Sequence, residues 1–313
     1  MTSRVLRSAT LVTLALASNA LAANAQQTHV IIITGLSAEP QYKTAFTKVA
    51  AMLADSARSR WKVADSSLIV LGEDAGMDPR HVQLKSTKEE VANAFLRMSK
   101  RVAPGDVLLV FLNGHGAGEG QTSRVNLPGP DPTAADFAAY LSGFPRQTVV
   151  FVNAASGSGD FVPVLAGRGR VIVTATKTAI ERNESIFATP FVRGLTGTEA
   201  DADKDGRVSV FEAFDFAKKE VVRAYEADKK LLTEHAILSD TVLARRVSFG
   251  TPVGTDPKVA ALVAERQALE SQVADLKARK SSTDSTAYAA QLEKLLLELA
   301  EKSQAIRAAG GKP

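Results

Sequence analysis

The segment DVLLVFLNGHGAGEG, residues 106–120, is the most informative about the fold. Its continuous apolar run is followed by a glycine-rich stretch, which is the pattern of a buried strand and the loop after it. Other short apolar runs of the same character lie at residues 28–34, 67–71, 148–153 and 170–174. Apolar, β-branched runs of this length are typical of parallel strands that are covered by helices on both faces. The sequence therefore predicts a mostly parallel sheet in which residues 106–113 form one strand.

Amphipathic stretches lie between these runs, at residues 42–56, 87–101 and 133–141. Ser86 with Glu89, and Thr133 with Asp136, place a hydroxyl three residues before an acid, which is the spacing of a helix-capping pair. We therefore expect helices to begin just after Ser86 and Thr133. Alternation of strands and helices predicts an α/β fold, a three-layer α/β/α sandwich.

The first 25 residues have the pattern of an export signal. Arg4 and Arg7 precede an apolar stretch at residues 9–21, and Ala23-Asn24-Ala25 forms an A-x-A cleavage site. The stretch is short for a membrane anchor. We expect cleavage after Ala25 and a periplasmic or secreted protein with no membrane span in the mature chain.

The composition of the 313 residues excludes several classes of function. Removal of the signal, which carries two arginines, would lower the formal net charge from +4 to +2, so a nucleic-acid partner is not expected. Cysteine is absent, which excludes disulfides, cysteine-ligated metals and a cysteine nucleophile. No H-E-x-x-H or phosphate-binding glycine loop occurs, so zinc catalysis and nucleotide binding have no support.

From about residue 251 the chain changes character and the strand-like runs stop. Apolar residues then recur at helical spacing, first at Leu262, Leu269 and Leu276, and later at Tyr288, Leu292, Leu295, Leu299 and Ile306. A polar turn at residues 281–286 separates the two sets. The pattern predicts a tail at 251–313, either a hairpin of two antiparallel helices or a short coiled coil with a partner, through which the protein could self-associate. The main domain would span residues 26–250.

Small polar residues follow two of the predicted strands. Gly114-His115-Gly116 follows the strand at 106–113, and Ser156-Gly157-Ser158-Gly159 follows the strand at 148–153. Because parallel sheets place ligands and catalytic groups at the carboxyl ends of their strands, neighbouring strands would bring His115 close to Ser156.

These two segments resemble the caspase–legumain superfamily of cysteine peptidases, over roughly residues 28–245. Gly114-His115-Gly116 matches the motif that carries the general base of that family. The motif of the nucleophile, Ala-Cys-x-Ser-Gly, aligns with residues 155–159 and puts Ser156 where the family has cysteine. The resemblance implies a caspase-like sheet, His115 as the base, and the backbone N–H groups of Gly116 and Ser156 as oxyanion donors.

Serine in place of cysteine changes the chemistry. A hydroxyl is a much weaker acid than a thiol, and serine enzymes usually need a third group that orients the histidine. No acid adjoins His115 in the sequence, although Glu119 is nearby. We therefore expect a degenerate peptidase homologue that binds a peptide or protein ligand or acts as a scaffold. The alternative is an active peptide hydrolase with a Ser156–His115 dyad; a third candidate is a calcium-binding protein whose partner docks on the tail.

Residues 201–212, DADKDGRVSVFE, match the calcium loop of EF-hand proteins. The expected ligands are oxygen atoms from Asp201, Asp203, Asp205, the carbonyl of Arg207, Ser209 and Glu212. Residues 210–225 have the pattern of the exiting helix. The sequence predicts a structural Ca²⁺ site, with one alternative: acids at a helix N-terminus are also favoured without a metal.

Overall fold

The structure is a computed structural model that describes residues 26–250, 257–280 and 284–310. The predicted export signal and its cleavage site, the first residues of the predicted tail at 251–256, and residues 281–283 of the predicted polar turn lie outside the described residues.

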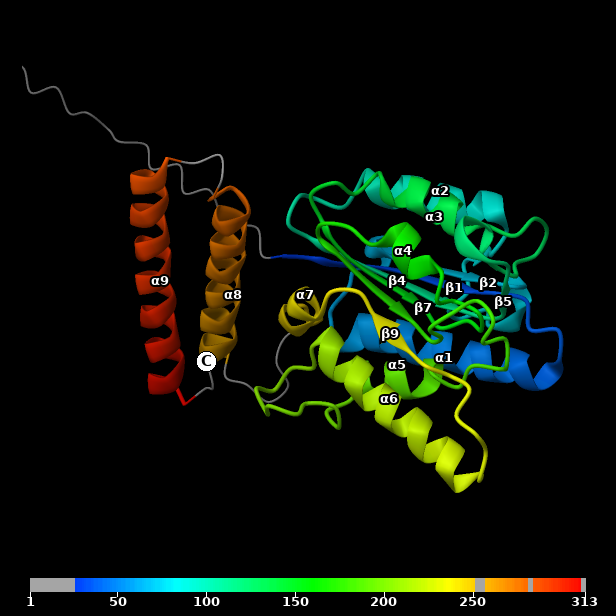
Figure 1. The fold of residues 1–313 in the computed structure, drawn as a ribbon. Helices are drawn as coiled ribbons and strands as arrows, with labels where there is room; N and C mark the ends of the chain where they lie inside the picture. Colours follow the sequence, from blue (N-terminus) through cyan, green and yellow to red (C-terminus); the bar gives the residue numbers. More distant parts are fainter. Residues whose placement is uncertain (1–25, 251–256, 281–283, 311–313) are drawn as a thin grey trace, which may run out of the picture.

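A seven-stranded sheet forms the centre of the molecule (Figure 1). Its strands, in spatial order, are β3 (Leu84–Lys85), β2 (Leu68–Gly72), β1 (Thr28–Thr34), β4 (Val107–Asn113), β7 (Thr148–Asn153), β8 (Arg170–Thr174) and β9 (Ile237–Leu238). All neighbours pair in parallel except β9, which runs antiparallel to β8. The register of β4 and β7 pairs Leu112 with Asn153, so both strands end at the same edge of the sheet.

Helices cover both faces of the sheet (Figure 1). One face carries α1 (Pro40–Ser59), α5 (Ala188–Thr196) and α6 (Val210–Ala227); the other carries α2 (Lys88–Ser99), α3 (Ala134–Leu141) and α4 (Phe161–Leu165). The short helix α7 (Thr241–Arg246) follows β9. The prediction of a three-layer α/β/α sandwich with a mostly parallel sheet is therefore confirmed.

Two hydrophobic clusters, one on each face of the sheet, hold these layers together. Alternate residues of β4 supply both: Phe111 packs with Phe191 of α5 on one side, while Val110 belongs to the cluster of α2, α3 and α4. Every residue of β4 is buried. Burial on both faces explains why this strand is a continuous apolar run rather than an alternating one.

The predicted start of α2 is wrong by one residue. Thr87, not Ser86, is the N-cap, and its hydroxyl accepts a hydrogen bond from the Glu90 N–H. The Ser86 hydroxyl instead donates to the Thr34 carbonyl of β1 at 2.7 Å. A tertiary contact therefore takes the hydroxyl that the sequence pattern assigned to the cap. The Thr133–Asp136 capping box is confirmed at α3.

The sequence patterns did not predict several short elements. They are the antiparallel pair β5 (Gly116–Ala117) and β6 (Arg124–Val125), the strands β3 and β9, and the 3-10 turns at Asp65–Ser67, Ala75–Met77 and Gly120–Thr122. Segments this short carry too few residues to show a period.

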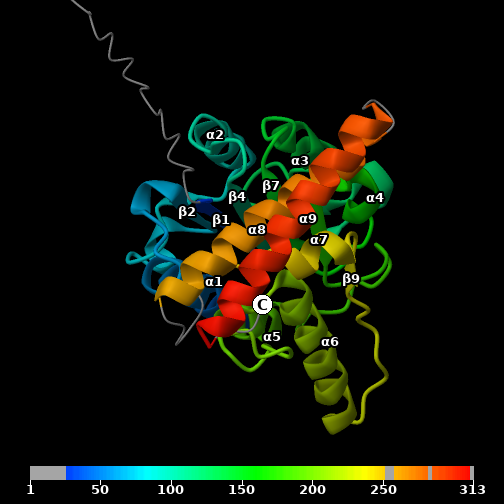
Figure 2. The same ribbon diagram turned by 90° about the vertical axis from the view of Figure 1, so that its left-hand side faces the viewer.

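Two long helices, α8 (Pro257–Ala278) and α9 (Ser285–Ala308), lie side by side at one end of the molecule (Figures 1 and 2). The helix α8 lies between α9 and the sheet domain, and Arg168 forms an ion pair with Asp275 of α8 at 3.3 Å. In the described part of the chain, no helix is both long enough and apolar enough to cross a membrane.

The loop after β7 passes against the loop after β8 at Gly159. A Cβ atom at this position would overlap the carbonyl group of Lys177. We predict that Gly159→Ala lowers the free energy of unfolding by about 3 kcal/mol, because backbone atoms cannot move aside cheaply. Gly167→Ala is the matched control, since its Cβ would meet only Arg170 Cδ, at 3.9 Å. Denaturant unfolding of both variants tests this; equal stabilities would contradict it.

Candidate functional site

His115 lies two residues beyond the end of β4, at the carboxyl edge of the sheet. Two aromatic rings of α1 lie against its imidazole, both edge to face: the ring centroids of Tyr42 and Phe46 are 5.0 and 5.3 Å from it and 6.2 Å from each other, so both rings are on the same side. The backbone carbonyl of His115 accepts a hydrogen bond from the Asn126 N–H at 2.9 Å. The histidine is thus held by its backbone and packed by aromatic rings.

Ser156 lies directly against the chain that carries His115. The N–H of Gly116 donates to Ser156 Oγ at 3.4 Å. A Cβ at position 116 would lie 2.5 Å from the Ser156 carbonyl oxygen and 2.9 Å from that of Arg124, so only glycine permits this approach. The predicted juxtaposition of the two strand ends is therefore present at the level of the backbone.

The side chains of His115 and Ser156 do not form a dyad in this conformation. Among the residues that the structure describes, the His115 ring has no hydrogen-bond partner, neither Ser156 nor an acid. Ser156 is 4% exposed. A general base must lie within hydrogen-bond reach of its nucleophile, so an attack by Ser156 would require the imidazole to move.

The second serine of the motif has a structural place. Ser158 Oγ accepts a hydrogen bond from the Thr176 N–H at 3.3 Å, and Thr176 Oγ1 accepts one from the Gly159 N–H at 3.1 Å. These bonds join the loop after β7 to the loop after β8. Ser158 and Thr176, both buried, therefore cross-link two strand ends.

Sequence reasoning missed the residues that surround His115. Tyr42 and Phe46 were expected only as part of an amphipathic helix, although a spacing of four residues places them on one face of α1. Glu184, from the loop after β8, reaches Tyr42. A hydrogen bond with Gln41 lowers the pKa of Tyr42, but the hydrogen bond and negative charge of Glu184 outweigh it and leave that pKa raised.

A buried carboxylate also anchors this loop. Glu234 accepts hydrogen bonds from the Ser185 hydroxyl at 2.5 Å and from the Ile186 and Phe187 N–H groups at 3.0 Å. Because these two N–H groups lie at the start of α5, Glu234 holds the beginning of that helix.

The other histidine near this loop has a structural role. The backbone N–H of His235 donates to Glu181 at 2.9 Å, and its Nδ1 lies 3.3 Å from the same carboxylate. Glu181 belongs to the loop after β8. His235 therefore fastens that loop and does not join His115.

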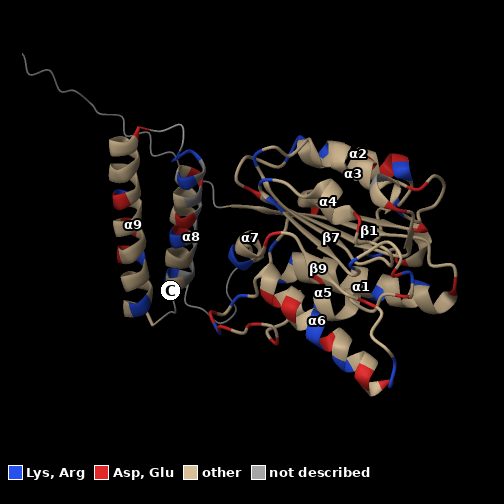
Figure 3. Cartoon of the chain, viewed as in Figure 1, with Lys and Arg blue, Asp and Glu red and all other residues tan. Residues whose placement is uncertain are grey.

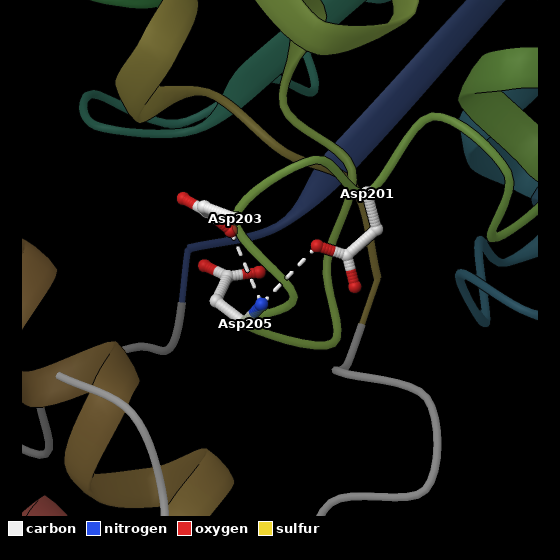
Figure 4. A group of neighbouring side chains, drawn as sticks. All are labelled: Asp201, Asp203 and Asp205. Atoms are coloured by element: carbon white, nitrogen blue, oxygen red, sulfur yellow. Dashed lines mark hydrogen bonds between the residues drawn. The ribbon is translucent and has the colours of Figure 1, made fainter.

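The acidic loop brings three of the predicted calcium ligands together (Figure 4). Carboxylate oxygens of Asp201, Asp203 and Asp205 lie within 4.8 Å of one another. The loop's own backbone holds two of these side chains: Asp205 N–H donates to both Asp201 and Asp203 at 3.1 Å, and Gly206 N–H donates to Asp201 at 3.0 Å. The carboxylates therefore converge as the pattern predicts.

Ser209 and Glu212 are close to the loop but are engaged with each other. They form a capping box at the start of α6, in which the Ser209 hydroxyl donates to Glu212 Oε2 at 2.7 Å. The other oxygen of Glu212 accepts from the Ala202 N–H at 3.0 Å.

The Arg207 side chain is largely buried and donates to the Gly250 carbonyl, and burial lowers its pKa.

The charges of the loop repel one another. Burial raises the pKa of Asp203, and the negative charge of Glu212 raises it further. Burial also raises the pKa of Asp205, with smaller contributions from Asp203 and Asp201. A divalent cation would relieve this repulsion, since opposite charge favours the ionised carboxylates. The three aspartates therefore offer hard oxygen donors, the type of ligand that Ca²⁺ takes.

The surroundings of the loop differ from those of a paired EF-hand. Residues 197–200 separate the end of α5 from Asp201. On the other side of the loop, Ser209 forms an isolated antiparallel bridge with Ser248. The N–H of the first residue of α6 donates to the Val247 carbonyl at 2.8 Å. The segment after α7 therefore pairs with this end of the loop, where paired EF-hands use a second loop.

The buried carboxyl of Glu234 leads to a prediction about pH. Burial raises its pKa and outweighs the three hydrogen bonds that lower it. The folded protein therefore holds this proton more tightly than the unfolded chain, and its free energy of unfolding falls as the pH rises from the ordinary glutamate range through the raised pKa. We predict that wild type loses stability relative to Glu234→Gln as the pH is raised from about 4 to about 7. Denaturant unfolding at a series of pH values measures the difference; a difference that stays constant, or that grows in favour of wild type, would contradict the prediction.

Comparisons with known proteins add little to this geometry. The chain matches no family model and no curated protein. Among solved structures it is similar to protein GSU0716 from Geobacter sulfurreducens, with 11% sequence identity and a TM-score of 0.42, over 70% of this chain and 96% of that one. The chemistry of the site therefore has to be argued from its own residues.

Proposed function

We propose that this chain is an exported, caspase/legumain-like peptidase homologue that binds a peptide or protein segment beside His115 without cleaving it. The observation that carries the proposal is the hydrogen bond from the Gly116 N–H to Ser156 Oγ. In the peptidases that this chain resembles, the corresponding N–H would donate a hydrogen bond to the oxyanion formed from the substrate. Here it is directed at the residue in the position of the nucleophile.

Two further features favour binding over hydrolysis. Among the described residues, no acid is hydrogen-bonded to His115, so nothing orients the imidazole or stabilises its protonated form. Ser156 is buried, and its hydroxyl is not paired with a base. Serine without an adjacent base is a weak nucleophile.

The surroundings of His115 suit a ligand with both apolar and polar groups. Tyr42 and Phe46 present stacked aromatic rings, and the imidazole beside them is partly exposed. Glu184 places a carboxylate beside the Tyr42 side chain. Aromatic and imidazole groups at one strand end can hold a peptide by packing and by hydrogen bonds to its backbone.

A serine-directed fluorophosphonate probe and a peptide-binding screen test this function together. We predict no labelling of Ser156, and binding of selected peptides that weakens at least tenfold in both Tyr42→Ala and His115→Ala. Tyr288→Ala, which removes an aromatic ring from α9, is the control and should bind normally. Labelling that disappears in Ser156→Ala would establish the hydrolase alternative, and a screen without any bound peptide would overturn the binding function.

We propose in addition that the loop at 201–212 binds Ca²⁺ in a structural role. Its support is the convergence of the three aspartates, with Glu212 facing the first residues of the loop. Full coordination would require Glu212 to exchange its hydrogen bonds for the ion. Because the loop joins α5 to α6, an ion there would stabilise the end of α5 and the start of α6, while Glu234 holds the beginning of α5.

Thermal unfolding with calcium and with a chelator tests the loop. We predict that calcium at about 100 times its dissociation constant stabilises wild type by about 2.7 kcal/mol, because an ion that binds only the folded state must raise its stability. Asp203→Ala should lose this response. Asp215→Ala, which removes a partly exposed acid of α6 that pairs with Lys219, should keep it. An equal response in wild type and Asp203→Ala would exclude the site.

A further inference from the structure

The helix α9 has two different long faces. Its inner face packs on α8 and carries partly or fully buried residues: Tyr288, Leu292, Leu295, Leu299 and Ile306. Its outer face is exposed throughout and carries, at the same helical spacing, Ala289, Glu293, Leu296, Leu297, Ala300, Gln304 and Arg307. We call this second set the outer stripe.

The outer stripe combines apolar residues with small ones. Leu296 is 49% exposed and Leu297 is 59% exposed. Next to them lies a shallow, open depression lined by Tyr288, Ala289, Leu292, Glu293, Leu296 and Leu297. The two exposed leucines give the outer stripe an apolar part that a second molecule can contact.

The sheet domain of the same chain does not cover the outer stripe. The helix α8 lies between α9 and that domain (Figure 1). Two helices with a single shared seam bury little apolar surface, and such pairs gain stability when they join a larger bundle. In the part of the chain that the structure describes, nothing covers the outer stripe, so the stripe is open to a second molecule.

The charges of the stripe identify the occupant. Glu293 and Arg307 each lie seven residues from Ala300, on opposite sides, and neither has an ion-pair partner among the described residues. Charged groups occupy only part of α9 (Figure 3). If two copies of α9 pair antiparallel about an axis at Ala300, Glu293 of each copy faces Arg307 of the other. A surface that complements itself in this way is what a two-fold dimer requires.

We infer that the protein forms a homodimer through the outer stripes of two α9 helices, which together with the two α8 helices make a four-helix bundle. Ala300 lets the helices approach closely at the axis. Leu296 and Leu297 cover the alkyl part of Gln304 of the second copy. The contact runs along helices of 24 residues, about 36 Å in length. This inference does not depend on the proposed function.

Charge reversal tests the dimer by sedimentation equilibrium of the purified protein. We expect a dimer for wild type, a dissociation constant at least tenfold weaker for Glu293→Arg and for Arg307→Glu, and recovery to within about threefold in the double variant. Lys294→Glu, on another face of α9, is the control and should dimerise as wild type does. All these positions are exposed, so circular dichroism should show the same helix content throughout.

Two outcomes would overturn the inference. One is a wild-type protein that stays monomeric at about 100 μM, well above the range of a specific dimer. The other is a dimer whose affinity does not change in either single charge variant, because the helices would then meet through a different surface. Failure of either kind would leave the peptide-binding proposal at His115 untouched.

Discussion

The parallel pairing of β4 with β7 is the interaction on which the rest of the structure depends. The register that pairs Leu112 with Asn153 ends both strands at one edge of the sheet. It thereby brings the residues that follow them, His115 and Ser156, to the same place. The pairing is stable because both strands are buried on both faces, with their aromatic and aliphatic side chains shared between two hydrophobic clusters.

The close approach of the chain at Gly116 to the loop after β7 then determines which groups are paired at this edge of the sheet. Gly116 lets the chain after β4 touch the loop after β7, and its N–H is turned toward Ser156 Oγ. The same approach that brings the two strand ends together thus engages the Gly116 N–H with the Ser156 hydroxyl. This hydrogen bond is the observation on which the proposal of peptide binding without cleavage rests.

Local patterns predicted the structure well where neighbouring residues supply the partners. The Thr133–Asp136 capping box and the convergence of Asp201, Asp203 and Asp205 both involve residues a few positions apart, and both are present. Patterns failed where the partner is distant in the chain. The Ser86 hydroxyl binds the Thr34 carbonyl instead of capping α2, and Glu234 holds a helix that begins almost fifty residues earlier.

The sequence by itself determined the layered α/β/α fold, because continuous apolar runs separated by amphipathic stretches can bury their side chains in few other ways. It also located His115 and Ser156 at strand ends. Only the tertiary structure decided the relations between side chains: that the His115 ring packs against Tyr42 and Phe46, and that Ser156 pairs with a backbone N–H. The physical reason is that periodicity records which face of an element is buried, whereas a hydrogen bond depends on where distant segments meet.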